Sequence, residues 1–378
     1  MLVDRDRHFD VIVIGVGGIG SATVYELARS GNDVLGIERH GIPHTKGSSH
    51  GHTRMIRRAY HENPEYMAMI DQAYTRWEQL EDEWGEQLLY KTGSIAAGRP
   101  SCDLVSGALE TCHEHSVPFE KIDGESASER FPGFQFPSEY EVVVQSDGGF
   151  VRPEAATIAH VELARQLGAT IQSETKVTSW ESTIDGVKVK TEDGQYKADR
   201  LVIAAGAWIG KMVESLEGIV SPERQVLSWL QPNNETHFTP ENCPVFLISD
   251  DDNIHYGFPT FGKPGVKFGR HYHLNERVDP DEMDHSVNEH DMEVLTQSGE
   301  KYLNVSGEDP FGFETCIYTN TPDRDFIIDT LPNHPEVTVL GGFSGHGYKF
   351  AGVIGKIAAD LANGKDPEID ISLFEIDR

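Results

Sequence analysis

The stretch FDVIVIGVGGIGSATVYELARSGNDVLGIER, residues 9–39, decides the fold of this chain. Its first part, FDVIVIG at 9–15, is a continuous β-branched run that is typical of a buried parallel strand. The next part, IGSATVYELARSG at 19–31, predicts a helix that ends at Gly31, and DVLGIER at 33–39 predicts a second buried strand. Strand, helix and strand in this order form a βαβ unit of an α/β fold.

Three glycines of this unit have the G-x-G-x-x-G spacing of dinucleotide-binding folds. The first allows a tight turn, the second lets the backbone approach a pyrophosphate, and the third packs the helix on the strand. An acid about 20 residues further on accepts a hydrogen bond from a ribose hydroxyl. A glycine-rich turn of an unrelated α/β protein is the alternative, but strand, loop, helix and acid agree here. The residues expected to contact the dinucleotide are Gly15, Gly17, Gly18, Ile19, Gly20 and Glu38.

Three later segments favour FAD over NAD as the dinucleotide. Residues 153–177 predict a helix followed by a strand that reaches Val177, and YKADRLVIAAGAW at 196–208 predicts a strand that runs into Ala205–Gly206. Residues 337–364 predict a strand, a glycine-rich loop and a long helix. These separate returns to one sheet indicate a flavoprotein domain interrupted by insertions, whereas an NAD domain is normally contiguous. We therefore expect Val177, Ala205 and Gly206 at the cofactor.

The chain is expected to contain two interleaved domains. The FAD-binding domain would comprise residues 1–85, 145–215 and 325–378, and a substrate domain would comprise 86–144 and 216–324. The second insertion is β-rich, with strands predicted in QVLSWLQP (225–232), CPVFLIS (243–249), IHYGFPTF (254–261) and GVKFGRHYHL (265–274). Such a domain would cover one face of the flavin.

Composition restricts the partners. The 378 residues include 62 acidic and 32 basic side chains, which gives a net charge of −30 and argues against a nucleic acid or an anionic membrane as partner. The acids are scattered, as in EQLEDEWGEQ, SDDDN and DPDEMDH, and adaptation to high salt is one hypothesis for them. The N-terminal stretch does not have the pattern of a signal peptide, and no apolar run is long enough to span a membrane. We expect a cytoplasmic protein with reduced thiols.

The four cysteines do not form a C-x-x-C pair, so the spacing suggests neither a zinc site nor a redox pair. Two H-x-H pairs, His50 with His52 and His271 with His273, could suggest a metal. Without a third ligand in view, we expect no metal.

Five motifs in order resemble the family of monomeric sarcosine oxidase and N-methyltryptophan oxidase, over nearly the whole chain. They are HTKGSSHGHTRMIRRAYHENPEY (44–66), YGFPTFG (256–262), GVKFGRH (265–271), CIYTNTPDRDFIID (316–329) and GFSGHGYKFAGVIG (342–355). The resemblance implies a monomeric flavoenzyme that oxidises secondary amino acids with O₂. It also implies that Cys316 is bonded through sulfur to the 8α carbon of FAD, whereas a cysteine in a core strand is the plain alternative.

The resemblance further assigns roles to residues of these motifs. Flavin contacts are implied for His50, Thr53, Gly342, Phe343, Gly345, Gly347 and Lys349, and the helix after the last loop would direct its N-terminal dipole at the flavin. Substrate binding is implied for Arg57, Lys349 and Gly345, and the two cations would hold the substrate carboxylate. Lys267 would assist the reaction with O₂ as a fixed cation. Arg54, His271, Tyr256 and Tyr318 match other active-site positions.

Three departures from the family pattern concern the substrate side chain. Position 49 is Ser where a second histidine is common, Leu247 replaces a frequent methionine, and GRHYH differs around His271. The expected reaction turns an N-methyl amino acid such as sarcosine into the demethylated amino acid, formaldehyde and hydrogen peroxide. Alternatives are oxidation of N-methyltryptophan, pipecolate or proline, a dehydrogenase with another electron acceptor, an NAD enzyme, and a flavoprotein without catalytic activity.

Overall fold

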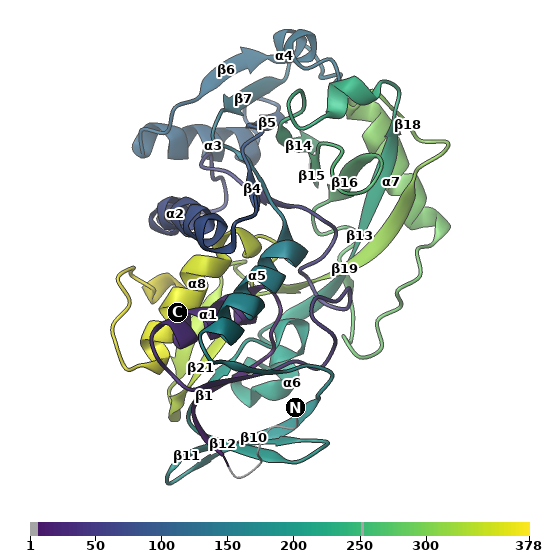
Figure 1. Cartoon of the computed structure of the whole chain (residues 1–378). Helices are drawn as coiled ribbons and strands as arrows, with labels where there is room; N and C mark the ends of the chain where they lie inside the picture. Colours follow the sequence, from purple (N-terminus) through teal and green to yellow (C-terminus); the bar gives the residue numbers. More distant parts are fainter. Residues whose placement is uncertain (1–6, 251–252) are drawn as a thin grey trace.

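The computed structural model describes residues 7–250 and 253–378. The chain forms two large sheets, one in the lower and one in the upper half of Figure 1, joined by the long strands β13 (Ser221–Pro232) and β19 (Gly312–Asn320). Three predictions include residues outside the described part of the chain: both domain assignments, at 1–6 and at 251–252, and the acidic stretch SDDDN.

An eight-stranded sheet carries the βαβ unit. Its order is β10-β11-β12-β1-β2-β9, with β21 paired to β12 and β20 to β21. The pairs β1–β2, β1–β12, β2–β9 and β12–β21 are parallel, as the βαβ prediction requires. The strand bounds are β1 (His8–Ile14), β2 (Val34–Ile37), β9 (Thr170–Gln172), β10 (Val177–Thr183), β11 (Gly186–Thr191), β12 (Gln195–Ile203), β20 (Ile327–Leu331) and β21 (His334–Gly341).

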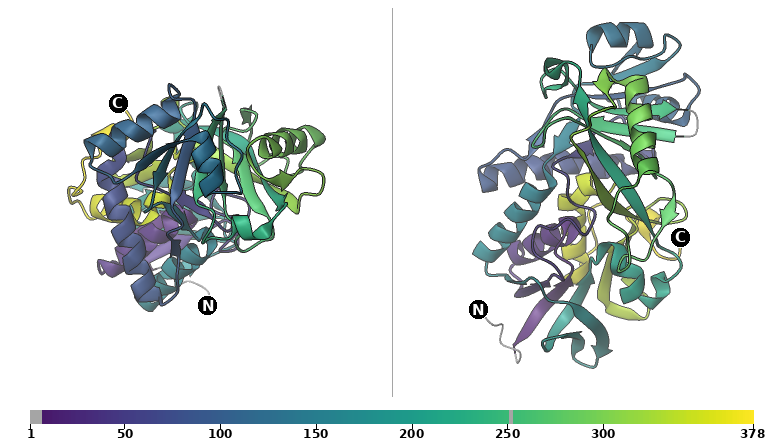
Figure 2. Two further views of the ribbon diagram at one scale, coloured as in Figure 1. Left: turned by 90° about the horizontal axis from the view of Figure 1, so that it is seen from above. Right: turned by 90° about the vertical axis from the view of Figure 1, so that its right-hand side faces the viewer.

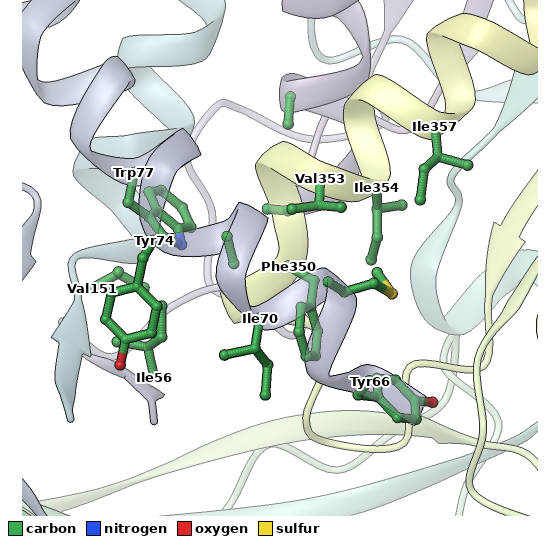
Figure 3. Close-up of a cluster of buried hydrophobic side chains, with 14 of the residues drawn as sticks. Ile56, Tyr66, Ile70, Tyr74, Trp77, Val151, Phe350, Val353, Ile354 and Ile357 are labelled. Atoms are coloured by element: carbon green, nitrogen blue, oxygen red, sulfur yellow. The ribbon is translucent and has the colours of Figure 1, made fainter. Parts of the chain in front are cut away.

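Three helices pack together on this sheet, and a fourth covers them. They are α1 (Gly18–Arg29), α5 (Pro153–Gln166), α8 (Ala351–Ala362) and α2 (Met67–Trp84). A side chain at Gly355 would lie 2.7 Å from the Ala22 backbone, so α8 and α1 can approach closely only because Gly355 has none. Figure 3 shows Ile70 of α2 beside Phe350, in one buried cluster with Trp77 of α2 and with Val353 and Ile354 of α8. Each of these side chains is fully buried and contributes about 1.5–3 kcal/mol.

A ten-stranded sheet forms most of the upper half of the molecule (Figures 1 and 2). Its order is β17-β13-β16-β15-β14-β5-β7-β6, and β18 and β19 also pair with β13. The remaining bounds are β5 (Ser94–Gly98), β6 (Glu120–Asp123), β7 (Glu141–Gln145), β14 (Val245–Asp250), β15 (Asn253–Phe258), β16 (Val266–Arg270), β17 (Glu276–Arg277) and β18 (Val305–Ser306). The helices of this half are α3 (Asp103–Glu114), α4 (Gly124–Arg130) and α7 (Glu289–Tyr302), and the short α6 (Ile209–Met212) follows β12.

A three-stranded sheet, β3 (Arg54–Ile56), β8 (Gly149–Val151) and β4 (Leu89–Tyr90), lies in the order β3-β8-β4. The α/β fold class is confirmed, and the four strands predicted between residues 225 and 274 are present as β13 to β16. Helix α7 lies within the segment expected to be β-rich, and its Asn288–Asp291 capping box is a start signal that the sequence analysis did not use. The division into two domains at the stated boundaries stays a prediction. Within 7–250 and 253–378, no helix is long and apolar enough to cross a membrane.

Candidate active site

A cavity of about 410 Å³ opens where β1 and β2 end, at the carboxyl edge of the parallel sheet. The chain leaves β1 through Gly15, whose φ of +89° favours glycine, and enters α1 at Gly18. The α1 N-cap is Gly17, and no side chain caps the first backbone N–H groups. These N–H groups and the positive end of the helix dipole therefore remain available to a phosphate.

The glycines where β1 passes into α1 have two different roles. Gly15 and Gly20 allow close backbone packing, and Gly17 leaves open space next to the loop. A side chain at Gly20 would lie 1.8 Å from the Gly15 carbonyl oxygen, and one at Gly15 would lie 2.4 Å from the Ala204 carbonyl oxygen. At Gly17, an added side-chain carbon would meet nothing within 4 Å. The loop thus leaves room beside Gly17, where a pyrophosphate fits.

Glu38 has the position that the dinucleotide reading requires. Its carboxylate accepts hydrogen bonds of 2.9 Å from the backbone N–H groups of Val16 and His40. Burial opposes the charged form, but His44 and these N–H groups lower the pKa of Glu38 below its ordinary value. A buried, ionised acceptor at the cavity wall suits a ribose hydroxyl. The free helix terminus, the open space at Gly17 and this acceptor together fit FAD.

Most of the predicted cofactor contacts line this cavity. They are Gly15, Gly17, Gly18, Ile19, Glu38, Val177, Ala205, Gly206, Gly342, Phe343, Gly345 and Gly347, and the predicted catalytic residues Arg54 and Tyr318 line it too. Five predicted contacts do not line it: Gly20, His50, Thr53, Cys316 and Lys349. Gly20 instead packs α1 against the loop after β1.

Cys316 lies on β19, buried beside Leu227, Trp229 and Tyr256. Its sulfur is 3.8 Å from Arg54 Nη2 and 3.9 Å from the Ser48 carbonyl oxygen. Arg54 and Ser48 both line the cavity, so the thiol lies directly behind its wall. The guanidinium can donate a hydrogen bond to the sulfur.

Lys267, on β16, is buried although a lysine on a strand is more often exposed. Its ammonium donates to the carbonyl oxygens of Gly51 and Thr53, at 2.8 and 2.9 Å, and to the Thr53 hydroxyl at 3.1 Å. Burial and the Arg54 cation lower the pKa of Lys267 well below its ordinary value. His50 lies nearby with both ring nitrogens unpartnered, and burial lowers its pKa to about 3. The loop at 50–53 and β16 are therefore joined by this one lysine.

Arg57 and Lys349, the predicted carboxylate pair, are both buried. Arg57 is already engaged, because its Nη2 lies 2.8 Å from both carboxylate oxygens of Glu62. Lys349 donates to the His346 carbonyl oxygen at 2.5 Å, and its ammonium lies 5.1 Å from the Tyr60 ring centroid. Burial lowers the pKa of Lys349 to about 7, with Glu62 opposing this shift and Arg57 adding to it.

Three predicted aromatic residues, His271, Tyr256 and Tyr318, lie together. The ring centroids of His271 and Tyr318 are 5.5 Å apart, and those of His271 and Tyr256 are 6.4 Å apart. Burial lowers the pKa of His271 to about 3 and raises that of Tyr256 to about 12, so both side chains are neutral at neutral pH. Both histidines of the H-x-H pair lie in the turn after β16, where Tyr272 has a φ of +55°, and His273 contacts Asp291 at 2.9 Å. No group of three or more His, Cys, Asp and Glu side chains in the described ranges could hold a metal ion.

Sequence reasoning missed several residues of the site. Glu62 follows Arg57 by five residues, and burial alone would raise its pKa, but Arg57, His61, His346 and Lys349 together lower it well below its ordinary value. His346 bonds the Tyr60 hydroxyl at 2.5 Å. Glu62 and His346 lie inside the motifs quoted above, a few residues from Arg57 and Lys349. That nearness in the sequence was the signal that could have identified them. At the other end of the cavity, a network formed by Arg39, Trp208, Lys211 and Asp281 gave no sequence signal.

Comparisons with known proteins agree with this geometry. The model of the family described as "FAD dependent oxidoreductase" matches residues 10–361. The chain is 37% identical to a monomeric sarcosine oxidase of Streptomyces avermitilis, over 97% of each chain. It is 33% identical to an N-methyl-L-tryptophan oxidase of Citrobacter koseri, over 98% of this chain and 99% of the other. A solved structure of NikD, an amino acid oxidase of nikkomycin biosynthesis, superposes with a TM-score of 0.85 at 26% identity, over 98% and 97% of the two chains. The chain therefore belongs to the FAD dependent oxidoreductase family, within the group that contains the monomeric sarcosine oxidases and the N-methyl-L-tryptophan oxidases.

Proposed function

We propose that this enzyme oxidises the C–N bond of N-methyl amino acids, with sarcosine as the type substrate. The observation that carries the proposal is the burial of two cations, Arg57 and Lys349, on the ring of Tyr60 in a chain with a net charge of −30. Buried cations are costly unless carboxylates balance them, and one carboxylate, Glu62, serves both, so a substrate carboxylate would supply the second.

The cofactor would be held along the cavity described above. The N-terminus of α1 would face the pyrophosphate, Glu38 a ribose hydroxyl, and the loop from Gly342 to Gly347 the flavin end. FAD, when bound, supplies the electron acceptor for the substrate and passes the electrons to O₂ as hydrogen peroxide. Binding and orientation of the substrate and exclusion of water would be the functions of the residues of this chain.

Arg57 and Lys349 would orient the substrate by its carboxylate. Arg57 can hold a carboxylate through two N–H groups, and Lys349 adds a point charge. Because Glu62 now occupies Nη2 of Arg57, binding requires this ion pair to loosen or to share the guanidinium. Fixing the carboxylate fixes the distance of the reacting carbon from the flavin, which is the positioning contribution of the protein.

The aromatic residues would receive the rest of the substrate. His271, Tyr256 and Tyr318 are neutral at neutral pH, and their rings exclude water from the reacting C–N bond. The same burial disfavours a charged amine beside these rings, so the substrate amine would bind in its neutral form. For sarcosine the balance is sarcosine, O₂ and water giving glycine, formaldehyde and hydrogen peroxide.

Two finer assignments belong to this proposal. Cys316 would carry the flavin through its sulfur, supported by the nearness of Arg54 and Ser48 to that sulfur at the cavity wall. Lys267 would be the fixed cation for the reaction with O₂, supported by its burial between β16 and the loop at 50–53. Denaturation in acid should leave flavin attached to the wild-type chain and free in Cys316→Ser, and free flavin from both would refute the attachment.

Anaerobic bleaching of the visible flavin bands tests the function. Sarcosine, N-methyltryptophan, pipecolate and proline would be added in turn, followed by measurement of peroxide and formaldehyde in air. We expect sarcosine to bleach the flavin, and Arg57→Met to lower kcat/KM at least a hundredfold. Arg58→Met is the matched control, since Arg58 pairs with Asp71 and stacks on Tyr74, away from the site. A flavin-containing protein that none of the four amines bleaches would overturn the proposal.

Lys267→Met tests the acceptor. In an oxidase it should slow reoxidation by O₂ strongly while leaving reduction by substrate intact, whereas a dehydrogenase with another acceptor should hardly respond. Lys263→Met is the matched control, because Lys263 lies on the nearby turn and pairs with Glu314. The cytoplasmic location and the monomeric state stay predictions.

A further inference from the structure

Arg324 is a half-buried cation that the proposed reaction does not use. It lies in the turn between β19 and β20, and its guanidinium carbon is 4.1 Å from the ring centroid of Tyr272. Among the residues described by the structure, no carboxylate forms an ion pair with it and no acceptor takes a hydrogen bond from its guanidinium.

The position of Arg324 connects it to the substrate side of the site. The Tyr272 ring centroid is 4.0 Å from that of His271 and 6.0 Å from that of Tyr318. The positive charge of Arg324 also contributes to the lowered pKa of His271, where burial is the largest cause. The guanidinium therefore lies within electrostatic reach of the ring set that would receive the substrate.

The backbone also ties Arg324 to the carboxylate-binding lysine. Its carbonyl oxygen is 3.1 Å from His346 Nε2, and the His346 carbonyl in turn accepts from Lys349. The Arg324 backbone and the Lys349 ammonium thus both contact His346, the first at its ring and the second at its carbonyl. A substrate held by Lys349 would extend past this histidine to bring a second group to Arg324.

Both members of the stacked pair have a backbone conformation that side chains rarely adopt. The φ of Arg324 is +71° and that of Tyr272 is +55°. The turn holds Arg324 through its N–H bond to the Thr321 carbonyl at 3.3 Å and through the Thr321 hydroxyl bond to the Asp325 carbonyl at 2.7 Å. Unfavourable conformations that the surrounding structure maintains concentrate at ligand sites.

A guanidinium that lies on an aromatic ring keeps its N–H edge free. That edge can grip a carboxylate through two parallel hydrogen bonds, and the ring fixes its orientation. We propose that Arg324, on the Tyr272 ring, binds a second carboxylate of the substrate, so that N-methyl amino acids with an acidic side chain are preferred. N-methylaspartate and N-methylglutamate represent this class. The inference rests on the proposed function, because it concerns the same site and the same oxidation.

The test compares the kcat/KM of an acidic substrate with that of its neutral isostere. The holoenzyme would be assayed for peroxide with N-methyl-L-glutamate, N-methyl-L-glutamine and sarcosine. We expect a preference of at least tenfold in kcat/KM for the acid over the isostere, carried mainly by KM. In Arg324→Gln this ratio should fall to about one, with sarcosine kcat/KM changed less than about threefold. Arg324→Lys, which keeps the charge, should retain part of the preference.

Arg378→Gln is the matched control, because it removes a cation of the C-terminal segment that packs against the same turn and already pairs with Asp323. It should leave the ratio unchanged. The inference would be overturned if the wild-type enzyme had equal kcat/KM for N-methyl-L-glutamate and N-methyl-L-glutamine. It would also be overturned if the preference for the acid persisted in Arg324→Gln. Turnover of sarcosine would still support the proposed function in either case. Loss of turnover with all three compounds in a folded, flavin-containing wild type would overturn both.

Discussion

Arg57 and Glu62 show how one ion pair can set the behaviour of a site. Two N–O distances of 2.8 Å join them, and Glu62 is 20% exposed while Arg57 is 4% exposed. A buried pair of this kind keeps the guanidinium charged and oriented, yet it competes with any other carboxylate for the same N–H groups. The pKa of Lys349 depends on the same ion pair, since Glu62 raises this pKa and Arg57 lowers it.

Glu62→Gln should release Arg57 for the substrate. The change also removes the charge that raises the pKa of Lys349, so the comparison is made in acid that keeps Lys349 protonated in both proteins, where we expect a carboxylate inhibitor to bind several-fold more tightly to the variant. The same change removes the charge that balances a buried guanidinium, so Tm should fall. Spectral titration of the flavin and thermal unfolding would measure the two effects. Glu65→Gln is the control, because Glu65 is exposed in the same segment. Weaker inhibitor binding in Glu62→Gln would contradict the competition.

The pKa of Lys349 predicts a pH dependence of carboxylate binding. With a pKa of about 7, Lys349 is charged below pH 7 and neutral above it, so the affinity should be high in mild acid and fall as pH rises. An inhibitor without an amine, such as methoxyacetate, keeps substrate titration out of the profile. The dissociation constant should rise about tenfold between pH 6 and pH 8.5 in wild type. The profile should be flat in Lys349→Met, and an equally steep profile there would assign the titration to another group.

At the scale of elements, the loop between β1 and α1 has two separate functions, which are packing of α1 and access for the cofactor. Gly20 lets α1 lie against the Gly15 carbonyl, and Gly17 leaves open space at the helix N-terminus. The first job concerns packing of the fold, and the second concerns approach of the cofactor.

Gly17→Ala and Gly20→Ala should therefore fail in different ways. Gly17→Ala should fold with nearly unchanged Tm of the flavin-free protein but a lower flavin-to-protein ratio, because its methyl group fills the phosphate space. Gly20→Ala should lower stability itself, since its methyl group would lie 1.8 Å from a carbonyl oxygen and the helix must move. Absorbance ratios and urea unfolding separate the two outcomes. Equal losses of stability in both variants would refute the division of labour.

At the scale of the whole molecule, the charge is the dominant feature. At a net charge of −30 the acidic side chains repel one another, and many of them are exposed. The described ion pairs at the surface, such as Lys91–Glu78 and Arg130–Glu120, involve only part of them and each contributes little. Screening by salt weakens the remaining repulsion.

Stability should therefore increase with salt. Raising KCl from about 0.1 M to about 2 M shortens the screening length from ~10 Å to below ~3 Å, and we expect Tm to rise by several degrees. The measurement is thermal unfolding of the holoenzyme, with sucrose as a control that does not screen charge. A Tm that is flat or falls with KCl would remove the argument for adaptation to high salt.

Local patterns were sufficient for much of the fold and for the kind of cofactor, whereas the roles of the site residues came from the family resemblance and stay predictions. The spacing of Gly15, Gly17 and Gly20 after a β-branched run encodes a backbone path, because glycine conformation and strand burial depend on residues a few positions apart. Motifs around Arg57, Cys316 and Lys349 identified the charged and nucleophilic groups. Helix α7 was missed because its residues, mostly polar, give a weak periodic signal within a segment of strands.

Only the tertiary structure decided which groups meet and which are charged. The pairing of Arg57 with Glu62, the three acceptors of Lys267, and the stacking of Arg324 on Tyr272 depend on how separate segments pack. The pKa values of Lys349 and His271 depend on how much water that packing removes. The sequence by itself determined the βαβ unit, the kind of cofactor and the cations available. Register and burial bring distant side chains together, and these long-range contacts follow from the whole fold and not from local spacing.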